Sequence, residues 1–394
     1  MTPRSTFHPL VLLALLASGC NPAAGSAPFV ERDSAGVRLV ASARRLWRAG
    51  REWRVDSLPA VEIRGGPAGP PREVVAGVVL PSGDVVVADG ASQEVRWYDG
   101  SGRYLRSWRG DGSPGGEFGS LAALAALDDG GVLAWDGATL RSVRFGADGT
   151  PRPSPPLSAD EPGRLEGVFG DGSLLFGGAR SNEFVVSPVP RREPFALVRY
   201  SAPPPRVDTL REELGPEEFT WGGEGFALRQ PAPFGRRTFV AAWGRRLWIA
   251  DSERFEVRTY DDAGRLLRVA RAAVAPQPID ARERERFRAR LAARARASLS
   301  AGTADSLLAS LPFPATRPAF AELRVDSDGR VWLRSAASDH DRRWTVLDER
   351  GRMLGTVLLP AGLDVLDIGP DVVLGVWTDA RGNQHLRLHR LRRR

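Results

Sequence analysis

Two stretches of this chain match almost residue for residue, and this repeat constrains the fold more than any other feature. The first copy begins with Val85-Val86-Val87-Ala88-Asp89 and the second with Leu247-Trp248-Ile249-Ala250-Asp251. In each copy a second Asp follows ten residues after the first, and a Gly follows three residues after that. Alternating apolar residues, separated by residues that tolerate positive φ, predict a strand, a turn, a strand, an Asp-x-x-Gly turn and a further strand.

Weaker copies of the pattern recur at 132–136, 173–176, 331–333 and 372–377, which makes six units. Six four-stranded units with a period of about 50 residues are typical of a β-propeller, in which each blade is a small sheet and neighbouring blades bury each other's faces. We therefore predict an all-β, six-bladed β-propeller. The last unit shows about three strands, so we expect residues 36–40 to supply its fourth strand and close the ring.

Two insertions lengthen the repeat. Residues 181–235 are rich in Pro and Gly, and residues 280–311 are expected to insert an α-helical segment between blades 4 and 5. Asp280 and Glu283 fit a capping box, and apolar residues then recur every four positions. The other faces of this helix are rich in Arg. They either steer anionic partners or form an ordinary solvated face.

The first twenty residues have the form of an export signal. Arg4 precedes an apolar run of eight residues, 10–17, which is too short to cross a bilayer because a crossing takes about 20 residues. The segment resembles a bacterial lipoprotein signal peptide, in which small residues before an invariant Cys mark the site of cleavage and lipidation. The resemblance implies a signal peptide at 1–19 and a lipidated Cys20. A free or buried Cys beside a chance apolar run is the alternative.

The residues after Cys20 are small, polar and rich in helix breakers, so we expect a flexible tether at 20–33. Together with the lipid anchor, this places the protein in the bacterial cell envelope. By resemblance to the enterobacterial sorting rule, Asn21 favours the outer membrane, with the protein facing the periplasm.

Several motifs resemble a known group of proteins. These are the Asp-x-x-Gly spacing, the glycine-rich segment 110–118, Leu311-Pro312-Phe313-Pro314 and the ending at 386–391. They resemble NHL-like or TolB-like six-bladed propellers, and more closely a family of bacterial propeller lipoproteins of unknown function. The resemblance covers nearly the whole of 34–394, the range that we assign to the propeller. It implies a fold and an envelope location.

Composition narrows the chemistry. All 55 basic residues are Arg, so the chain has no lysine for a Schiff base or a P-loop. Cys20 is its one thiol, which excludes an intramolecular disulfide. The formal net charge of +7 is mild, and the export signal argues against nucleic acid as a partner.

Three motifs have ordinary structural explanations. Gly110-x-Gly112-x-x-Gly115 matches a dinucleotide fingerprint, but the residues after it lead into another strand instead of a helix, so we predict a loop. Asp339-His340-Asp341 has the composition of a metal site or a tuned histidine, and we interpret it as a solvated turn. His385 and His389 lie among arginines, and we assign them to the closing strand and the basic tail.

One Asp ends the first apolar strand of three units: Asp89, Asp136 and Asp251. These residues either line one end of a central channel and bind a cation, as in calcium-dependent lactonase-like propellers, or cap their own turns. We favour turn caps, because Asp accepts hydrogen bonds from the amides of its own turn and because other calcium ligands, such as Asn, are scarce in this chain.

These observations predict a propeller that is tethered to the membrane through its lipid anchor. We expect it to act as a non-catalytic binding or scaffold module for a protein or an anionic envelope ligand, with no cofactor. The candidate binding residues lie in the two insertions: Trp221, Phe234, Arg284 and Arg288. The alternative is a lactonase-like or esterase-like propeller enzyme that depends on a divalent metal, and calcium enters only under this alternative.

Overall fold

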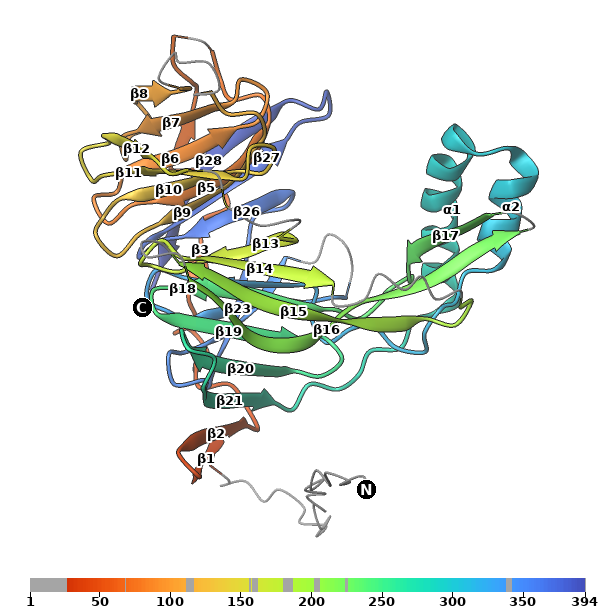
Figure 1. The fold of residues 1–394 in the computed structure, drawn as a ribbon. Coiled ribbons are helices and arrows are strands. Elements are labelled where there is room, and N and C mark those ends of the chain that lie inside the picture. The colour runs from red at the N-terminus through yellow and green to blue at the C-terminus, as the bar shows by residue number, and fades with distance from the viewer. Residues whose placement is uncertain are drawn as a thin grey trace, which may run out of the picture.

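The computed structural model describes residues 27–67, 69–110, 117–155, 157, 162–179, 187–201, 206–223, 226–337 and 342–393. Within these ranges the chain is mostly β, in agreement with the sequence, and its strands form six sheets. We number the sheets 1 to 6 along the chain. Figure 1 shows their arrangement and the helical segment that projects to one side.

Sheets 1 and 2 are regular four-stranded antiparallel sheets. Sheet 1 contains β5 (Val74–Val79), β6 (Val85–Asp89), β7 (Glu94–Tyr98) and β8 (Tyr104–Trp108). Sheet 2 contains β9 (Leu121–Ala126), β10 (Val132–Asp136), β11 (Arg141–Phe145) and β12 (Pro151–Pro153). Every residue of β6 is buried, as expected for a central strand with a sheet neighbour on both faces.

Sheets 3 and 4 are larger. Sheet 3 contains β13 (Arg164–Val168), β14 (Leu174–Ala179), β15 (Arg191–Ser201), β16 (Arg206–Gly223) and β17 (Phe226–Pro231). Sheet 4 contains β18 (Thr238–Trp243), β19 (Arg246–Asp251), β20 (Glu256–Asp261) and β21 (Leu266–Ala272), and it is extended by β2 (Val37–Ser42) and β1 (Phe29–Ser34). The region that is rich in Pro and Gly therefore contains the 18-residue strand β16, the longest of the sheet.

Sheets 5 and 6 complete the set. Sheet 5 contains β22 (Glu322–Val325), β23 (Val331–Arg334), β24 (Arg343–Leu347) and β25 (Met353–Leu358). Sheet 6 contains β26 (Leu363–Ile368), β27 (Val372–Thr378) and β28 (Gln384–Arg392), to which β3 (Arg54–Val55) and β4 (Val61–Ile63) are added. Two helices, α1 (Ala281–Ser298) and α2 (Ala301–Ala309), lie between β21 and β22 in the sequence.

Six hydrophobic clusters link the sheets into a closed cycle. Sheets 1 and 2 share a cluster around Trp97 and Phe145, and sheets 6 and 1 share one around Leu374 and Tyr98. The four remaining junctions, from sheet 2 to sheet 6, each contain a cluster of their own. Each sheet thus buries both faces against neighbours, which is the packing that the repeat predicts. We call the six sheets the body.

The N-terminal segment corrects one sequence prediction. Residues 36–40 do not complete the last sheet, because β2 pairs in parallel with β21 of sheet 4. The chain then passes the edge of sheet 5, where the amides of Leu46 and Trp47 bind carbonyls of β25. It reaches sheet 6 at β3 and β4, which both pair with β28. The segment therefore runs along the edges of sheets 4, 5 and 6 in turn. The strands that pair with β28 at the edge of sheet 6 lie after residues 36–40 in the chain.

The described residues also bear on the expected tether at 20–33. β1 begins at Phe29 and pairs with β2 from Phe29 to Ser34, so the last residues of that range are in a strand. Cys20 and the signal segment 1–19 lie outside the described residues. Their assignment stays a prediction.

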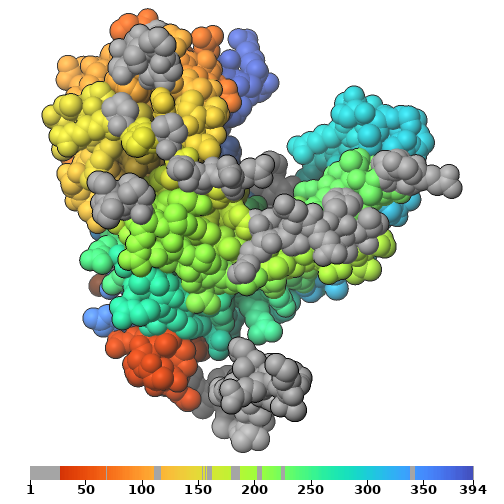
Figure 2. Space-filling view, in the orientation of Figure 1, coloured from red at the N-terminus to blue at the C-terminus, as the bar shows by residue number. Residues whose placement is uncertain are grey.

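A projecting arm accounts for both insertions. It consists of the far parts of β15 and β16, together with β17, α1 and α2, and Figure 1 shows it extending from the body. Asp280 accepts a hydrogen bond from the amide of Glu283, and the Glu283 side chain accepts one from the amide of Asp280. This capping box confirms the predicted helix start. In Figure 2 a hollow separates the arm from the upper part of the body.

Candidate functional site

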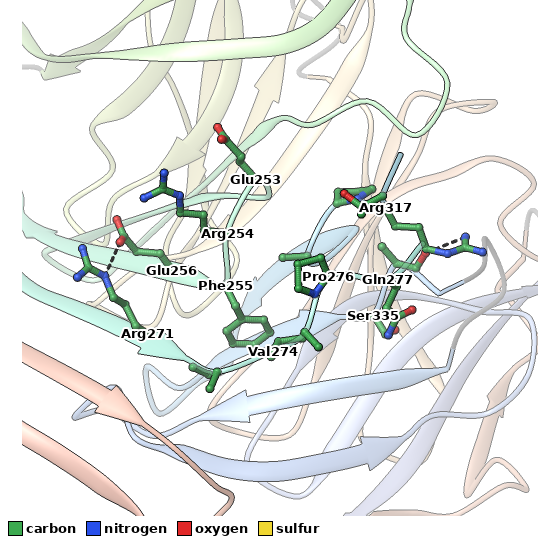
Figure 3. Close-up of a pocket in the computed structure, with 17 residues that line it drawn as sticks. Glu253, Arg254, Phe255, Glu256, Arg271, Val274, Pro276, Gln277, Arg317 and Ser335 are labelled. Atoms are coloured by element: carbon green, nitrogen blue, oxygen red, sulfur yellow. Dashed lines mark hydrogen bonds and ion pairs between the residues drawn. The ribbon is translucent and has the colours of Figure 1, made fainter. Parts of the chain in front are cut away.

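A cavity in the described part of the chain lies at the junction between the arm and the body. It has a volume of about 430 Å³. Its walls are the turn between β19 and β20, the segment from β21 to α1, the segment from α2 to β22, and the end of β23. Figure 3 shows Glu253, Arg254, Glu256 and Arg271 on one side of the cavity and Gln277, Arg317 and Ser335 on the other. We call it the junction pocket.

Local hydrogen bonds fix the first wall. Asp251 ends β19, and its carboxylate accepts a hydrogen bond of 2.9 Å from the amide of Glu253. Ser252 follows and is fully buried, and its carbonyl accepts a hydrogen bond from the amide of Ala319 at 2.7 Å. The turn is thereby bound to the segment that leads from α2 into β22.

The two segments that connect the helices to the body form the opposite wall. They pair at an antiparallel bridge between Pro278 and Thr316. The amide of Ile279 donates to the carbonyl of Ala315 at 3.1 Å, and the amide of Arg317 donates to the carbonyl of Gln277 at 2.9 Å. These hydrogen bonds hold the two segments together, so this wall of the pocket is fixed although neither segment is a helix or a strand.

Three arginines and two glutamates are the charged residues that line the pocket. The guanidinium of Arg317 is buried, where it binds Glu283 and the carbonyl of Ala336. Arg271 lies 2.7 Å from Glu256, and 61% of its side chain is exposed. Arg254 is exposed at the rim. Since guanidinium groups bind carboxylates and phosphates through paired N–H donors, Arg254 and Arg271 can receive an anionic group.

The floor of the pocket is apolar. The ring of Phe255 is buried there, and Val274 lies beside it with 42% of its surface exposed (Figure 3). The pocket therefore suits a ligand with an anionic group at one end and an apolar part at the other.

The three candidate channel aspartates cap their own turns, as the sequence predicts. Asp136 accepts a hydrogen bond of 2.9 Å from the amide of Ala138 in its own turn. It also accepts hydrogen bonds from the amides of Gly119 and Ser120, which precede β9, at 2.6 and 3.0 Å. Burial acts to raise the pKa of Asp136, but these and neighbouring hydrogen bonds outweigh it, so the pKa lies below its usual range. Asp89 and Asp251 accept hydrogen bonds from turn amides in the same way. Among the described residues, no three metal-ligating side chains form a group that suits a metal ion.

Trp221 and Phe234 belong to the inside of the arm. Trp221 is 6% exposed and packs in a cluster with Phe219 and Leu307. This candidate binding residue is therefore part of the core of the arm and not of an exposed face, because the helices of the second insertion cover it. Phe234 is half-buried and packs against Phe287, with ring centres 5.4 Å apart and ring planes tilted by 42°.

Arg284 and Arg288 also lie toward this interior. Both are half-buried, and the guanidinium of Arg288 stacks on the ring of Phe313 at 4.9 Å. The helical period explains their position, because residues 284, 288 and 291 fall on one side of α1. The exposed arginines of α1 lie at other positions, and the helical period of the sequence would have identified those positions.

Two of the remaining motifs fall outside the described residues. They are the core of the glycine-rich segment, 111–116, and the sequence Asp339-His340-Asp341. His385 and His389 lie on β28, as predicted. Burial lowers the pKa of His389, whose Nδ1 lies 2.9 Å from the carbonyl oxygen of Asp56.

The residues of the junction pocket were not predicted from the sequence. They come from four segments that are far apart in the chain, and no local motif marks them.

One observation concerns the membrane: within the described ranges, neither helix is long and apolar enough to cross a bilayer.

No family model matches the chain, and no curated protein matches it. Solved structures with a similar fold are propeller-like. A member of the DUF4221 family from Bacteroides vulgatus is 8% identical, with 87% of this chain and 99% of that chain covered and a TM-score of 0.47. A gluconolactonase from Xanthomonas campestris is 12% identical (88% and 100% covered, TM-score 0.40). A virginiamycin B lyase from Staphylococcus aureus is 10% identical (86% and 99% covered, TM-score 0.40). These similarities concern the fold alone.

Proposed function

We propose that this protein is a six-bladed propeller lipoprotein of the bacterial envelope, a binding module that holds an anionic ligand in the junction pocket. One observation carries the proposal: Arg254 and Arg271 stand at the rim of a cavity whose floor is apolar. In this account the six sheets are the blades, and the arm is inserted between blades 4 and 5 and forms one wall of the pocket.

The pocket favours binding over catalysis. Its ionisable side chains are glutamates and arginines, and Glu256 is engaged by Arg271. The divalent-metal enzyme of the alternative needs carboxylates that converge on one point. Backbone amides engage Asp89, Asp136 and Asp251 instead, and arginines also bind Asp89 and Asp251, so no observation favours this alternative.

Binding is tested with phenyl phosphate, which combines an anionic group with an apolar ring. We expect the melting temperature of the full chain in detergent to rise with ligand concentration, because the ligand binds the folded state. Arg254→Ala or Arg271→Ala should weaken binding tenfold or more, since a hydrogen bond to a charged group contributes about 1.5–3 kcal/mol.

Arg265→Ala is the matched control. Arg265 is an exposed arginine that is ion-paired to Asp261, and it lies at the other end of β20. The Arg265→Ala substitution should leave the binding of phenyl phosphate unchanged. An equal loss in the control, or no thermal shift with the native chain, would refute the pocket as the binding site.

The lipid anchor has its own test. Cys20→Ser removes the thiol that lipidation requires, so we expect the protein to move from the membrane fraction to the soluble fraction and to lose incorporation of a labelled fatty acid. Retention of the variant in the membrane fraction, with the label still attached, would contradict the anchor at Cys20.

A further inference from the structure

Helix α1 carries a cationic row on its outer side. Four exposed arginines follow one another at intervals of four residues: Arg282, Arg286, Arg290 and Arg294. At 1.5 Å per residue the row extends about 18 Å along the helix, and it winds slowly because four residues exceed one turn. We call these four residues the arginine row.

The opposite side of α1 is already occupied. Ala295 is buried in the core of the arm together with Phe219 and Trp221, and Phe287 and Leu291 pack against the same core. The helix is thus held in place by its apolar side. The four residues of the arginine row are not part of this core and are exposed.

The row is unfavourable for the helix itself. Like charges four residues apart on a helix repel and cost about 0.2–0.5 kcal/mol for each pair. Arg282 also lies in the first turn, where the helix dipole disfavours a cation. Glu283 lies 3.8 Å from Arg286, but it also binds the buried Arg317. A surface that opposes local stability is expected where it meets a partner.

We propose that the arginine row docks a linear polyanion, specifically an acidic polysaccharide with repeated carboxylates. Guanidinium groups bind carboxylates through paired hydrogen bonds, and a row of four engages several sugars of one chain at once. The proposal rests on the envelope location under Proposed function, which places the arm where such polymers occur.

An anionic lipid surface fits the row less well. Helices that bind at a bilayer surface insert an apolar side into it. The apolar side of α1 is buried in the arm. Among the described residues, those with large exposed apolar side chains all lie outside α1 and α2. Soluble polymer is therefore the occupant that this surface suits.

The test uses polygalacturonate as the probe and the full chain in detergent. We expect binding that weakens as salt rises, because the polymer releases counterions. Replacing all four arginines of the row by Gln should lower the affinity at least tenfold. The variant should remain folded, because the apolar side of α1 holds the helix in the arm.

A charge-matched control replaces four exposed arginines of the body by Gln: Arg32, Arg51, Arg72 and Arg265. It should bind polygalacturonate nearly as well as the native chain. An equal loss in this control would overturn the proposal, since net charge alone would then explain binding. Absence of binding to the polymer, or binding to phosphatidylglycerol vesicles in its place, would overturn it too.

Two readouts separate this proposal from the proposed function. The row variant should keep its thermal shift with phenyl phosphate and its membrane attachment, because it leaves the junction pocket and Cys20 intact. If these readouts fail in the native chain while polygalacturonate still binds through the row, the proposed function fails and the docking surface stands.

Discussion

Replacing Asp89 by Ala is expected to lower the free energy of unfolding by about 3–5 kcal/mol, because it removes one partner of a buried ion pair. Asp89 and Arg96 lie 2.9 Å apart, and their side chains are only 1% and 3% exposed. Without Asp89 the guanidinium of Arg96 still binds Glu94 and the carbonyl of Gly69, but it loses the carboxylate that is the more deeply buried of its two. The amides of Glu73 and Ala91, which donate to Asp89, lose their acceptor as well.

Urea unfolding of Asp89→Ala and of Asp99→Ala measures this effect. Asp99 also caps a turn of sheet 1, but its ion-pair partner Arg103 is 75% exposed, so its loss should cost about 1 kcal/mol. Asp89→Asn keeps an acceptor while it removes the charge, so an intermediate loss is expected. If Asp89→Ala cost no more than Asp99→Ala, the buried pair would not stabilise the blade.

The repeat predicts much of sheet 1 and less of sheet 4. Asp and Arg are seven residues apart in both copies, at Asp89 and Arg96 and again at Asp251 and Arg258. In sheet 1 these two residues form an ion pair. In sheet 4, Asp251 binds Arg192 of β15, and Arg258 binds Glu213 of β16 at 2.7 Å. The arm changes the pairing, and no local pattern shows that an inserted hairpin will reach these two residues.

Elements that depend on local periodicity were predicted well. The capping box at Asp280 and the glycine turns are set by nearby residues: Gly102 has a φ of 85°, and its amide donates to the carbonyl of Asp99. Closure of the last sheet was assigned to the wrong strand, because it depends on where the chain passes between Ser42 and Val61. The junction pocket was missed for the same reason, since its walls meet only through tertiary contacts.

Replacing Arg192 by Ala is expected to detach the base of the arm from sheet 4 and to cost about 3–5 kcal/mol. One guanidinium nitrogen of Arg192 donates to both carboxylate oxygens of Asp251, at 3.0 and 2.8 Å. The other two nitrogens donate to Thr238 Oγ1 and to the carbonyls of Leu214 and Gly215. The side chain of Arg192 is only 9% exposed, so its removal leaves several buried acceptors without a hydrogen-bond donor.

Hydrogen exchange distinguishes loss of this attachment from general destabilisation. In Arg192→Ala, amides of β16 near Leu214 and of the turn after Asp251 should exchange faster, while β6 in sheet 1 keeps its protection. Arg191→Ala is the control, because Arg191 is 54% exposed and lies 3.8 Å from Glu193, so it should change stability by less than about 1 kcal/mol.

Arg192→Lys should recover only part of the loss, since an ammonium cannot reproduce the planar fork of the guanidinium. Because the turn after Asp251 also forms a wall of the junction pocket, Arg192→Ala should weaken phenyl phosphate binding as well. Faster exchange spread evenly over all six sheets would show that Arg192 does not hold the arm in particular.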